Sequence, residues 1–501
     1  MFAINSPLQI CENIKLQIKH KDPPFVSGKG KLFFFREAVA QRGGAEDIYS
    51  TRPIRAKPKE IGMLIGFTLR NFRSFLDEQS FAFAASPDRA HESTHCVRTG
   101  MKSIPRLSKS AIIFGPNGSG KTNFVIALQT LRDLVLHSTA YSEAQFAELH
   151  TPFQFGPSAS GATEFQIDLL IAKVRYRYSI SYNAQRICSE RLLVYRTGKA
   201  QRWFERHYDE TSHTEEWTAF SPNFNGPREM WRKATRSKAL FVTTAAQLNS
   251  EQLKPVFHWF EHCLDIISPS ETIDLARIAL RIQDAEFKGR ILRLLRTLGI
   301  KVDDVRIAEP DSSAMDGGAS RAGALSHAPH TNLRPQVEFR YSKEGWPPVW
   351  LDPEYEAAGI QRLFGLIGPL LSAIETGKLL VVDEFDANLH PLIARFLITF
   401  VNDPNVSNRG AQLLLVSHNT TLMDLDMLRR DEIWLTELNA SHATTLSTVL
   451  RSSPRKHEHI AKGYLRGRYG AIPSIQPDIY TLTVKAVGNG NGRRGRTKLA
   501  N

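Results

Sequence analysis

One short segment, GPNGSGKT at residues 115–122, constrains this chain more than any other. It fits the pattern G-x-x-x-x-G-K-[ST] and follows an apolar run, Ala111 to Phe114, that predicts a buried strand. Residues Asn123 to Leu136 then predict an amphipathic helix. A strand, a glycine-rich loop and a helix in this order are the setting that a phosphate-binding loop requires. An ordinary glycine turn is the alternative, and this setting disfavours it.

The residue types of this loop fit a nucleoside triphosphate and its metal ion. Three glycines let the backbone curl so that its N–H groups point at phosphates, beside the positive end of the following helix. Lys121 would reach the β- and γ-phosphates, and Thr122 would place its hydroxyl on Mg²⁺. The sequence therefore predicts ATP and Mg²⁺ as ligands. The predicted nucleotide contacts in this loop are Gly115, Asn117, Gly118, Ser119, Gly120, Lys121 and Thr122.

A second motif downstream is an apolar strand that ends in two acids, Leu379 to Glu384. Asp383 would hold the Mg²⁺ shell, and Glu384 would accept a proton from the attacking water. Strands often end in acids that merely face solvent. The presence of Lys121 favours the functional interpretation, which adds hydrolysis to nucleotide binding.

A third motif, Gln412 to His418, predicts another buried strand followed by a histidine. His418 could donate a hydrogen bond to a γ-phosphate from the neighbouring strand edge, although a lone histidine after a strand is usually structural. The order of the three motifs favours a catalytic role for His418, since it is the order seen in ABC-type ATPases.

The chain resembles the SMC/RecF-like branch of the ABC ATPases over most of residues 63 to 475. The resemblance is carried by LIGFTLRNFRSF from Leu64, GPNGSGKT, DEFDANLHP from Asp383, and VSHN from Val416. Within that branch it looks like the stand-alone bacterial ATPases grouped with RloA and AbiL, which are linked to phage defence and often encoded beside a nuclease. The resemblance implies an α/β P-loop NTPase fold of ABC type, with an antiparallel β-lobe and an inserted helical arm.

In such ATPases two subunits enclose two ATP molecules, so the resemblance implies an ATP-dependent homodimer. Residues 356 to 363 lie where the signature segment belongs, and a helix beginning near Gly359 would point its N–H groups at the partner's γ-phosphate. The family usually has Ser near Ala357 and Thr near Ile360, so the contact across the dimer would be weaker or would rely on the backbone. Asn388 resembles the segment that crosses the interface, or else caps the next helix.

Two further residues have alternative interpretations. Gln154 lies roughly where a lid glutamine belongs, but a solvated strand glutamine is the simpler interpretation. Arg73 could approach the nucleotide, as the resemblance implies, or could be a surface arginine.

Composition places the chain among soluble proteins, with 42% hydrophobic and 23% charged residues in 501. We expect it to be cytoplasmic, because no apolar stretch is long enough to span a membrane and the first residues lack a signal pattern. The four cysteines include no C-x-x-C pair, so neither a disulfide framework nor a zinc site is indicated.

The net charge of +13 lies mostly at the two ends of the chain. Residues 1–62 have eleven basic and six acidic residues (+5), and residues 481–501 have five basic residues and no acid (+5), which leaves +3 for the rest. We expect 1–62 to be a poorly structured extension and 481–501 a disordered basic tail. The nearly neutral remainder does not favour a basic DNA groove.

The expected organisation between the two ends has three parts. Residues 63–224 form lobe I with the phosphate loop, 225–300 a helical insertion, and 301–480 lobe II with the signature-like segment, the acidic strand and His418. Two segments with strand-like alternation, Thr163 to Tyr182 and Arg191 to Arg206, predict the β-lobe.

Two apolar sets predict helices in the insertion. They are Leu253, Val256, Phe257, Phe260 and Leu264, and then Phe287, Ile291, Leu294, Leu295 and Leu298. A basic stripe of Arg290, Arg293 and Arg296 on the last helix could touch nucleic acid, although a solvated helix face is the more ordinary interpretation.

The function expected from the sequence is ATP-driven dimerisation and hydrolysis, a switch that controls a separate effector protein. The resemblance points to a nuclease effector in bacterial phage defence. The alternatives are a RecF/SMC-like repair or maintenance ATPase that binds DNA directly, a nuclease within this single chain, and a degenerate ATP-binding scaffold. The sequence leaves open the trigger, the effector, whether DNA or RNA is bound, and whether Ala357 and Ile360 weaken hydrolysis.

Overall fold

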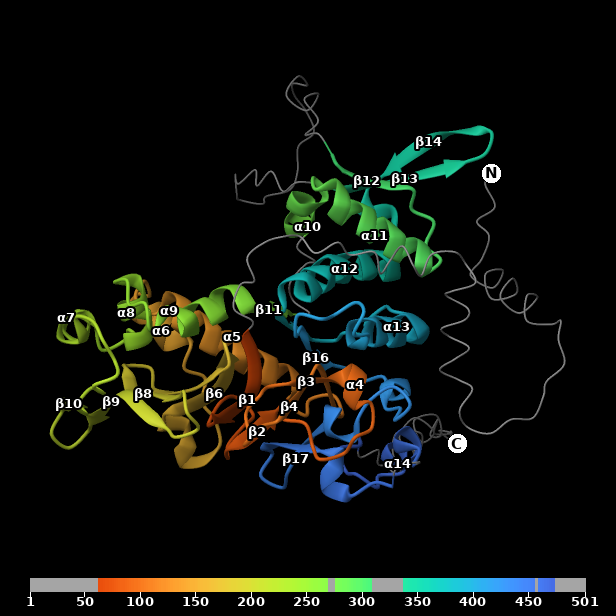
Figure 1. Cartoon of the computed structure of the whole chain (residues 1–501). Helices are drawn as coiled ribbons and strands as arrows, with labels where there is room; N and C mark the ends of the chain where they lie inside the picture. Colours follow the sequence, from red (N-terminus) through yellow and green to blue (C-terminus); the bar gives the residue numbers. More distant parts are fainter. Residues whose placement is uncertain (1–61, 269–274, 309–336, 456–457, 474–501) are drawn as a thin grey trace, which may run out of the picture. The chain divides into compact units, whose positions relative to one another are not determined.

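A computed structural model describes residues 62–268, 275–308, 337–455 and 458–473 (Figure 1). The predicted extension, except for Gly62, and the predicted basic tail lie outside the described residues. Among the helices of the described ranges, none combines the length and apolar character that a bilayer crossing requires.

Six described strands form a sheet in the order β11-β15-β16-β5-β17-β18, here called the core sheet. Neighbouring strands are parallel except for β17 and β18. Strands β5, β15 and β16 are buried along their whole length, as expected for apolar strands covered on both faces. The bounds are β5 (Ser110–Phe114), β11 (Leu264–Ile267), β15 (Leu379–Val382), β16 (Gln412–Val416), β17 (Ile433–Leu438) and β18 (Thr444–Thr448).

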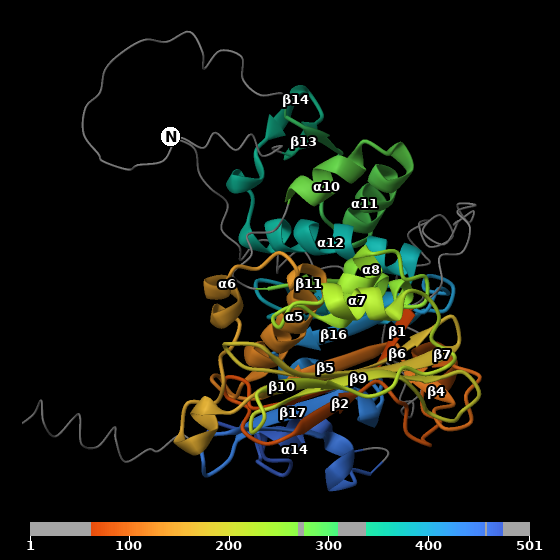
Figure 2. The same cartoon turned by 90° about the vertical axis from the view of Figure 1, so that its left-hand side faces the viewer.

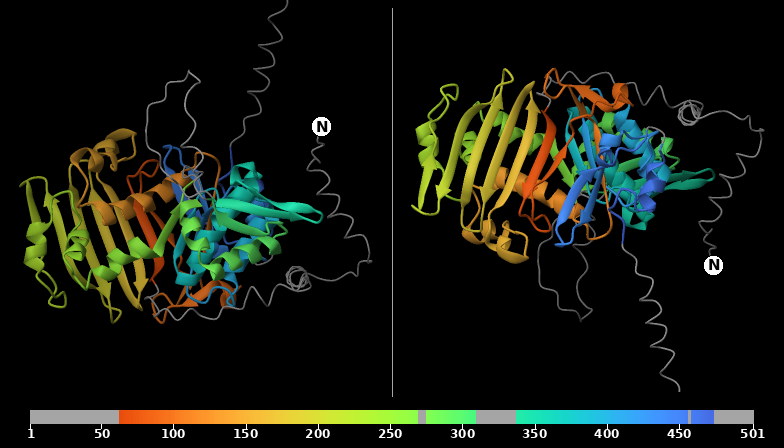
Figure 3. Two further views of the ribbon diagram at one scale, coloured as in Figure 1. Left: turned by 90° about the horizontal axis from the view of Figure 1, so that it is seen from above. Right: turned by 90° about the horizontal axis from the view of Figure 1, so that it is seen from below.

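Seven described strands form an antiparallel sheet in the order β10-β9-β8-β7-β6-β1-β2, here called the β-lobe (Figure 3). Buried and partly exposed residues alternate along β6 and β7, so that one face packs on the core. The two predicted strand segments correspond to β6 to β9. The bounds are β1 (Gly62–Arg70), β2 (Gln79–Ala82), β6 (Thr163–Ile171), β7 (Val174–Tyr182), β8 (Ile187–Tyr195), β9 (Gln201–Asp209) and β10 (Thr214–Trp217).

Helix α5 (Lys121–His137) joins the two sheets. The ring of Phe124 lies 5.6 Å from that of Phe67 in β1 and 5.6 Å from that of Phe81 in β2. The same buried cluster includes Val381 and Leu414 of the core sheet. The helix predicted after the phosphate loop is thus confirmed, and with it the α/β fold with an antiparallel β-lobe (Figure 2).

The range predicted to be a helical insertion contains five described helices and one strand. Helix α8 packs under the β-lobe, where Phe241 lies 4.7 Å from the ring of Phe204 in β9. Leu264, predicted to continue a helix, instead begins β11, because pairing with β15 overrides the local periodicity. The bounds are α7 (Arg228–Ala234), α8 (Phe241–Gln247), α9 (Lys254–His258), the π-helical turn η2 (Trp259–Cys263), α10 (Leu275–Ile282) and α11 (Ala285–Thr297).

The predicted basic stripe on α11 is partly engaged within the chain. Arg290 pairs with Glu375 at 2.7 Å, and Arg296 donates to the carbonyl oxygen of Asp303. Nε of Arg293 is buried and has no hydrogen-bond partner among the described residues. Arg296 is exposed, so this end of the stripe faces solvent.

The remaining elements connect or flank these layers. A further, three-stranded sheet, β12-β13-β14, precedes helix α12 in the chain, and α10 and α11 pack on α12 (Figure 1). The remaining strands are β3 (Cys96–Arg98), β4 (Arg106–Ser108), β12 (Asp304–Ile307), β13 (Val337–Lys343) and β14 (Trp346–Leu351). The remaining helices are α4 (Glu92–His95), α6 (Glu143–Glu148), α12 (Ala358–Thr376), α13 (Pro391–Asn402) and α14 (Ile460–Leu465), with short turns η1 (Gly156–Ser160), η4 (Pro353–Tyr355), η5 (Thr420–Leu422), η6 (Arg430–Glu432) and η7 (Val449–Ser452).

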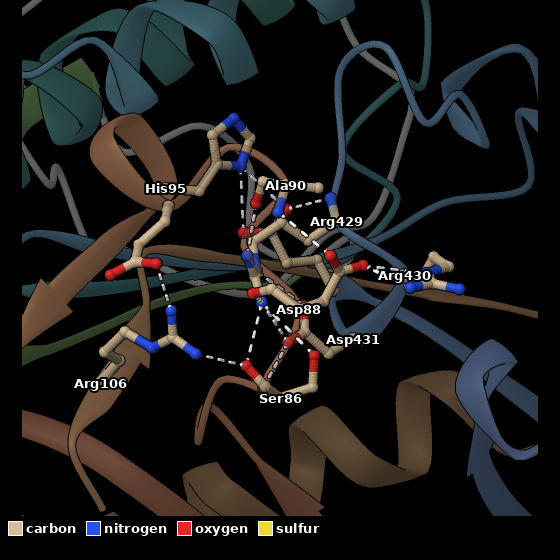
Figure 4. Close-up of polar contacts among 10 residues, drawn as sticks. Ser86, Asp88, Ala90, His95, Arg106, Arg429, Arg430 and Asp431 are labelled. Atoms are coloured by element: carbon tan, nitrogen blue, oxygen red, sulfur yellow. Dashed lines mark hydrogen bonds and ion pairs between the residues drawn. The ribbon is translucent and has the colours of Figure 1, made fainter. Parts of the chain in front are cut away.

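A buried charge network joins the segment before α4 to η6 (Figure 4). Arg429, whose side chain is 1% exposed, donates to both carboxylate oxygens of Asp431, at 2.9 and 2.8 Å. It also donates to the backbone carbonyls of Ser86, Asp88 and Ala90. Two segments far apart in the sequence are therefore held together by one guanidinium.

Two further pairs extend this network. Arg430 binds Asp88 at 2.5 Å, and Nδ1 of His95 lies 2.9 Å from the carboxylate of Glu432. Since Glu432 directly precedes β17, the network fixes the position where this strand enters the core sheet.

Candidate functional site

The phosphate loop joins β5 to α5 with backbone conformations that glycine allows. Gly118 and Gly120 have φ angles of 76° and 96°, in the left-handed region. Lys121 is buried, and its Nζ donates to the carbonyl oxygens of Gly115 and Pro116, at 2.9 and 2.8 Å. The backbone at the start of the loop thus binds the ammonium group of Lys121.

The hairpin β17–β18 supports this loop from one side. The hydroxyls of Ser119 and Thr436 form a 2.7 Å hydrogen bond, and Thr444 donates to the carbonyl of Ser119 at 3.0 Å. A Cβ on Gly120 would lie 2.1 Å from the Thr444 hydroxyl, so this position has room only for glycine. The Ser119 side chain faces the hairpin, so a contact from Ser119 to phosphate would come from its backbone. Asn117 and Gly118 are exposed at the tip of the loop.

The two acids follow β15, at the same edge of the core sheet as the phosphate loop. Strand β16 lies between β15 and β5, with all three strands parallel, and the carboxyl ends of parallel strands meet at one edge. Asp383 is buried, whereas Glu384 is exposed and has a φ of 48°. The left-handed backbone at Glu384 is a strained conformation for this residue type.

The charges of these groups influence one another. Burial lowers the pKa of Lys121 to about 8, and the nearby carboxylates of Asp383, Glu384 and Asp386 oppose this shift. Burial raises the pKa of Asp383, while the Thr122 hydroxyl and the Lys121 charge act in the opposite direction. The lysine, the hydroxyl and the acids are therefore close enough to influence one another's pKa.

The donor set fits a nucleotide with Mg²⁺. Oδ1 of Asp383 accepts a hydrogen bond from the Glu384 N–H at 2.9 Å, whereas its buried Oδ2 has no hydrogen-bond partner within the described part of the chain. A buried carboxylate oxygen without a partner beside a threonine hydroxyl matches the hard oxygen ligands that Mg²⁺ prefers. Thr122 and Asp383 would hold the ion, which would neutralise phosphate charge.

His418 follows β16, between the acidic strand and the phosphate loop in the sheet. It is exposed, and the charges of Lys121, Asp386, Glu384 and Asp383 act on its imidazole. Burial of part of the ring and the positive charge of Lys121 lower its pKa, so the imidazole is neutral near pH 7. A neutral imidazole has one N–H, which can donate to a phosphate oxygen.

The signature-like segment begins helix α12 and lies against the residues that follow the acidic strand. Ala357 is the N-cap of α12 and makes no capping hydrogen bond through its side chain. A Cβ on Gly359 would lie 2.7 Å from the carbonyl oxygen of Asn388, so the two segments are in close contact. Asn388 is exposed and has a φ of 61°.

Arg362 is a site residue to which the sequence assigned no role. Its side chain is buried, and Nη2 donates to the carbonyl oxygens of Asp383 and Glu384, at 3.1 and 2.9 Å. Burial lowers the pKa of Arg362, and the three nearby acids oppose this shift. The only signal in the sequence was its place in the signature-like segment, because its partners are backbone atoms of a different strand end.

Arg73 and Gln154, each of which has two interpretations from the sequence, have different environments. Nη1 of Arg73 lies 3.5 Å from Oδ1 of Asn123, the residue after Thr122, so this arginine is beside the phosphate loop. Gln154 is exposed, and its amide donates to the carbonyl of Pro152, within its own loop.

Comparison with solved structures finds SMC head domains. The SMC head domain from Thermotoga maritima is 14% identical, with a TM-score of 0.35, and the match covers 77% of this chain and 98% of that one. An Smc head with a coiled coil and joint from Pyrococcus yayanosii is 10% identical, with a TM-score of 0.35, and covers 81% and 100%. A third, from Pyrococcus furiosus and bound to the C-terminal domain of ScpA, is 11% identical, with a TM-score of 0.33, and covers 77% and 96%.

Similarity at these TM-scores assigns neither a family nor a function to the chain. No curated protein matches it. The family comparison is more informative, because it matches residues 110–424, more than half of the 501 residues. The matched range begins at β5, includes the phosphate loop, the acids and His418, and ends shortly after η5. Such P-loop ATPases generally use ATP and Mg²⁺. The chain therefore belongs to the family described as AAA domain, putative AbiEii toxin, Type IV TA system.

Proposed function

We propose that this chain binds MgATP, forms a homodimer around it, and hydrolyses it. The observation that carries the proposal is the meeting of Lys121 and Thr122 with Asp383, Glu384 and His418 at one edge of the core sheet. Lys121 and Thr122 would hold the phosphates and Mg²⁺ together with Asp383. Such a site stabilises the charge that spreads over the transferred phosphoryl group.

In the proposed hydrolysis, a water attacks the γ-phosphorus and the bond to the ADP oxygen breaks. Glu384 accepts a proton from the water, and the neutral His418 donates a hydrogen bond to the γ-phosphate. ADP and inorganic phosphate leave. The exposure of Glu384 at the strand end is compatible with access by water.

We further propose that dimerisation is a switch rather than the final activity. The segment at Gly359, in contact with Asn388, would face the phosphate of a second copy, so that the shared γ-phosphate favours the closed dimer and its loss reopens it. Because Ala357 offers no hydroxyl, the contact across the dimer would depend on backbone N–H groups of α12.

The proposed role of the switch is control of a separate effector, a nuclease, in bacterial phage defence. Support comes from the resemblance to RloA- and AbiL-like ATPases, and from the family description, which names a putative toxin of a type IV toxin–antitoxin system. Direct binding of DNA in repair or maintenance is the second candidate. The pairing of Arg290 with Glu375 gives it little support.

The test combines turnover with partner capture. Glu384→Gln should lower ATP turnover by roughly 100- to 10,000-fold, because the general base is lost, while MgATP binding is kept. Light scattering should then show a dimer that persists with ATP. The control is Glu143→Gln, a change at a side chain that is 93% exposed, which should keep full turnover.

Affinity purification of Glu384→Gln with ATP from native cells should recover a nuclease. Recovery of repair proteins or of DNA alone would favour the second candidate. A chain that neither turns over ATP nor dimerises with it would be a degenerate scaffold, and the proposal would be wrong.

A further inference from the structure

The charge of residues 63–480 is unevenly distributed. Residues 449–473 have six basic and one acidic residue (+5), although residues 63–480 as a whole have only +3. Residues 337–356 have five acidic and two basic residues (−3). The basic segment follows β18, and the acidic one includes the hairpin β13–β14. Both also carry exposed apolar side chains, a combination that is typical of protein interfaces.

The hairpin β13–β14 presents apolar side chains directly after its turn. Trp346 is 70% exposed and Val349 is 50% exposed, and Pro347 and Pro348 between them are exposed as well. Strand β14 is at the edge of its three-stranded sheet, and the two prolines remove N–H groups that a further strand would need. A partner is therefore expected to contact the side chains of β14 rather than its backbone.

Other residues of this sheet fix the hairpin in place. The ring centroid of Phe339 in β13 lies 4.8 Å from that of Phe364 in α12. The guanidinium of Arg306 in β12 lies 4.2 Å from the ring centroid of Trp350 in β14. The first contact holds the sheet against α12, and the second joins its two outer strands. The exposed apolar side chains thus belong to an ordered element.

The last described residues, 458–473, form a compact unit, here called the C-terminal knob. The Tyr464 hydroxyl donates to the carbonyl oxygen of Ala471 at 2.6 Å. The N–H of Ala471 in turn donates to the carboxylate of Glu437, in β17, at 2.8 Å. These bonds close the knob on itself and attach it to the core sheet.

The exposed side of the knob combines apolar side chains with positive charges. Leu465 is 65% exposed and Ile472 is 39% exposed. Ile472 lies against the end of α14, since its Cδ1 is 3.0 Å from the position that a Cβ on Gly467 would take. Lys462 and Arg466 are exposed and lie four positions apart, on one face of the helix beside Leu465. The apolar side chains therefore have a basic surround.

Within one copy of the chain the knob and the hairpin belong to different flanks of the core sheet. The knob is bound to β17. The sheet that contains the hairpin packs on α12, and α12 packs on β15. Strands β16 and β5 separate β15 from β17. The two complementary patches thus point to a contact between copies.

We propose that the knob of one copy of this chain binds the hairpin β13–β14 of another. Leu465 and Ile472 pack against Trp346 and Val349, and opposite charges surround this apolar centre. Because the contact joins two different patches, copies either pair reciprocally or continue into a larger assembly. The contact needs no nucleotide and goes beyond the ATP-dependent dimer of the proposed function.

Sedimentation velocity of the full chain without nucleotide tests this contact. The average mass should rise with concentration between about 1 and 100 μM, the range of weak contacts, and should decrease at about 1 M salt, where surface charges are screened. Trp346→Ser and Leu465→Ser should each weaken self-association by roughly 10- to 100-fold. The matched control is Met230→Ser, which changes a side chain of α7 that is 53% exposed and should keep self-association.

Mixing the two variants gives a sharper test. Each variant keeps only one intact patch, so each should remain a single copy when alone. In an equimolar mixture the intact knob of Trp346→Ser can bind the intact hairpin of Leu465→Ser, so one-to-one pairs should form. Thermal unfolding of both variants should match that of the unmodified chain, because both side chains are exposed.

Three results would overturn the contact. They are an unmodified chain that stays a single copy at about 100 μM, a loss with Met230→Ser equal to that of the two variants, and a mixture that does not pair. A loss confined to Trp346→Ser would overturn it by assigning the hairpin to another partner. If the unmodified chain is a single copy and Leu465→Ser lowers its binding to a short DNA duplex, the knob would instead be a nucleic-acid site. The assay contains no ATP, so its outcome is independent of the proposed hydrolysis.

Discussion

Arg362 contacts the backbone of Glu384, the proposed general base. Its two hydrogen bonds reach the carbonyls of Asp383 and Glu384, and Glu384 has the left-handed φ of 48°. A strained backbone persists only where its surroundings fix it. We therefore expect Arg362 to be a positioning residue, because it would act on the Glu384 carboxylate through the main chain.

Arg362→Met should lower kcat by roughly 10- to 100-fold with a smaller change in the affinity for ATP, because the carboxylate is misplaced while the phosphate loop is intact. Stability should fall by about 1 to 3 kcal/mol from the lost hydrogen bonds. Steady-state kinetics and chemical denaturation measure the two effects. Arg395→Met, at an arginine of α13 that is 30% exposed and pairs with Asp424, is the control and should keep kcat. A loss of affinity alone would contradict the positioning role.

Among the contacts between elements, the one between the start of α12 and the segment after β15 joins Gly359 to Asn388. Gly359 allows this contact, since any Cβ there would meet a backbone oxygen, which cannot rotate away as a side chain can. Gly359→Ala should therefore move α12 away from Asn388 and lower ATP turnover by roughly tenfold, although alanine favours helices.

Gly289→Ala in α11 is the matched control at this scale. The nearest atom to its new Cβ is Nη1 of Arg293, at 3.5 Å, an ordinary contact. This variant should gain about 0.5 to 1 kcal/mol of stability and keep its turnover. Turnover assays and thermal unfolding distinguish the two glycines, and equal behaviour of the two variants would contradict the proposed role of the contact.

At the scale of the whole molecule, the network around Arg429 joins distant parts of the chain (Figure 4). Arg429→Met would remove the guanidinium that pairs with the buried Asp431 carboxylate, to which the Ser86 N–H also donates, and that donates to the carbonyls of Asp88 and Ala90. Removing one partner of a buried ion pair costs about 3 to 5 kcal/mol. Denaturant unfolding should show this loss.

The control for Arg429 is Arg70→Met, which removes a surface pair whose side chains are 56% and 45% exposed. The exposed pair should contribute about 0 to 1 kcal/mol. A similar, small effect in both variants would mean that the buried network is not a main source of stability.

The strand, loop and helix at residues 110–137 could be predicted because their signals are local. Apolar runs, glycine spacing and helical periodicity are all contained in a short stretch. The same holds for the alternation that predicted β6 and β7. The apolar periodicity that included Leu264 failed, because pairing with β15 decided the conformation there.

The sequence alone predicted the fold class, the residue types of the candidate site and the order of its motifs. Which residues contact one another became clear from the three-dimensional structure. The bonds of Arg362 to two strand-end carbonyls, the facing rings of Phe155 and His442, and the contact of Gly359 with Asn388 all join segments that no local pattern relates. The physical reason is that such contacts depend on strand order and on the packing of α5 and α12, which are set by the burial of the whole core.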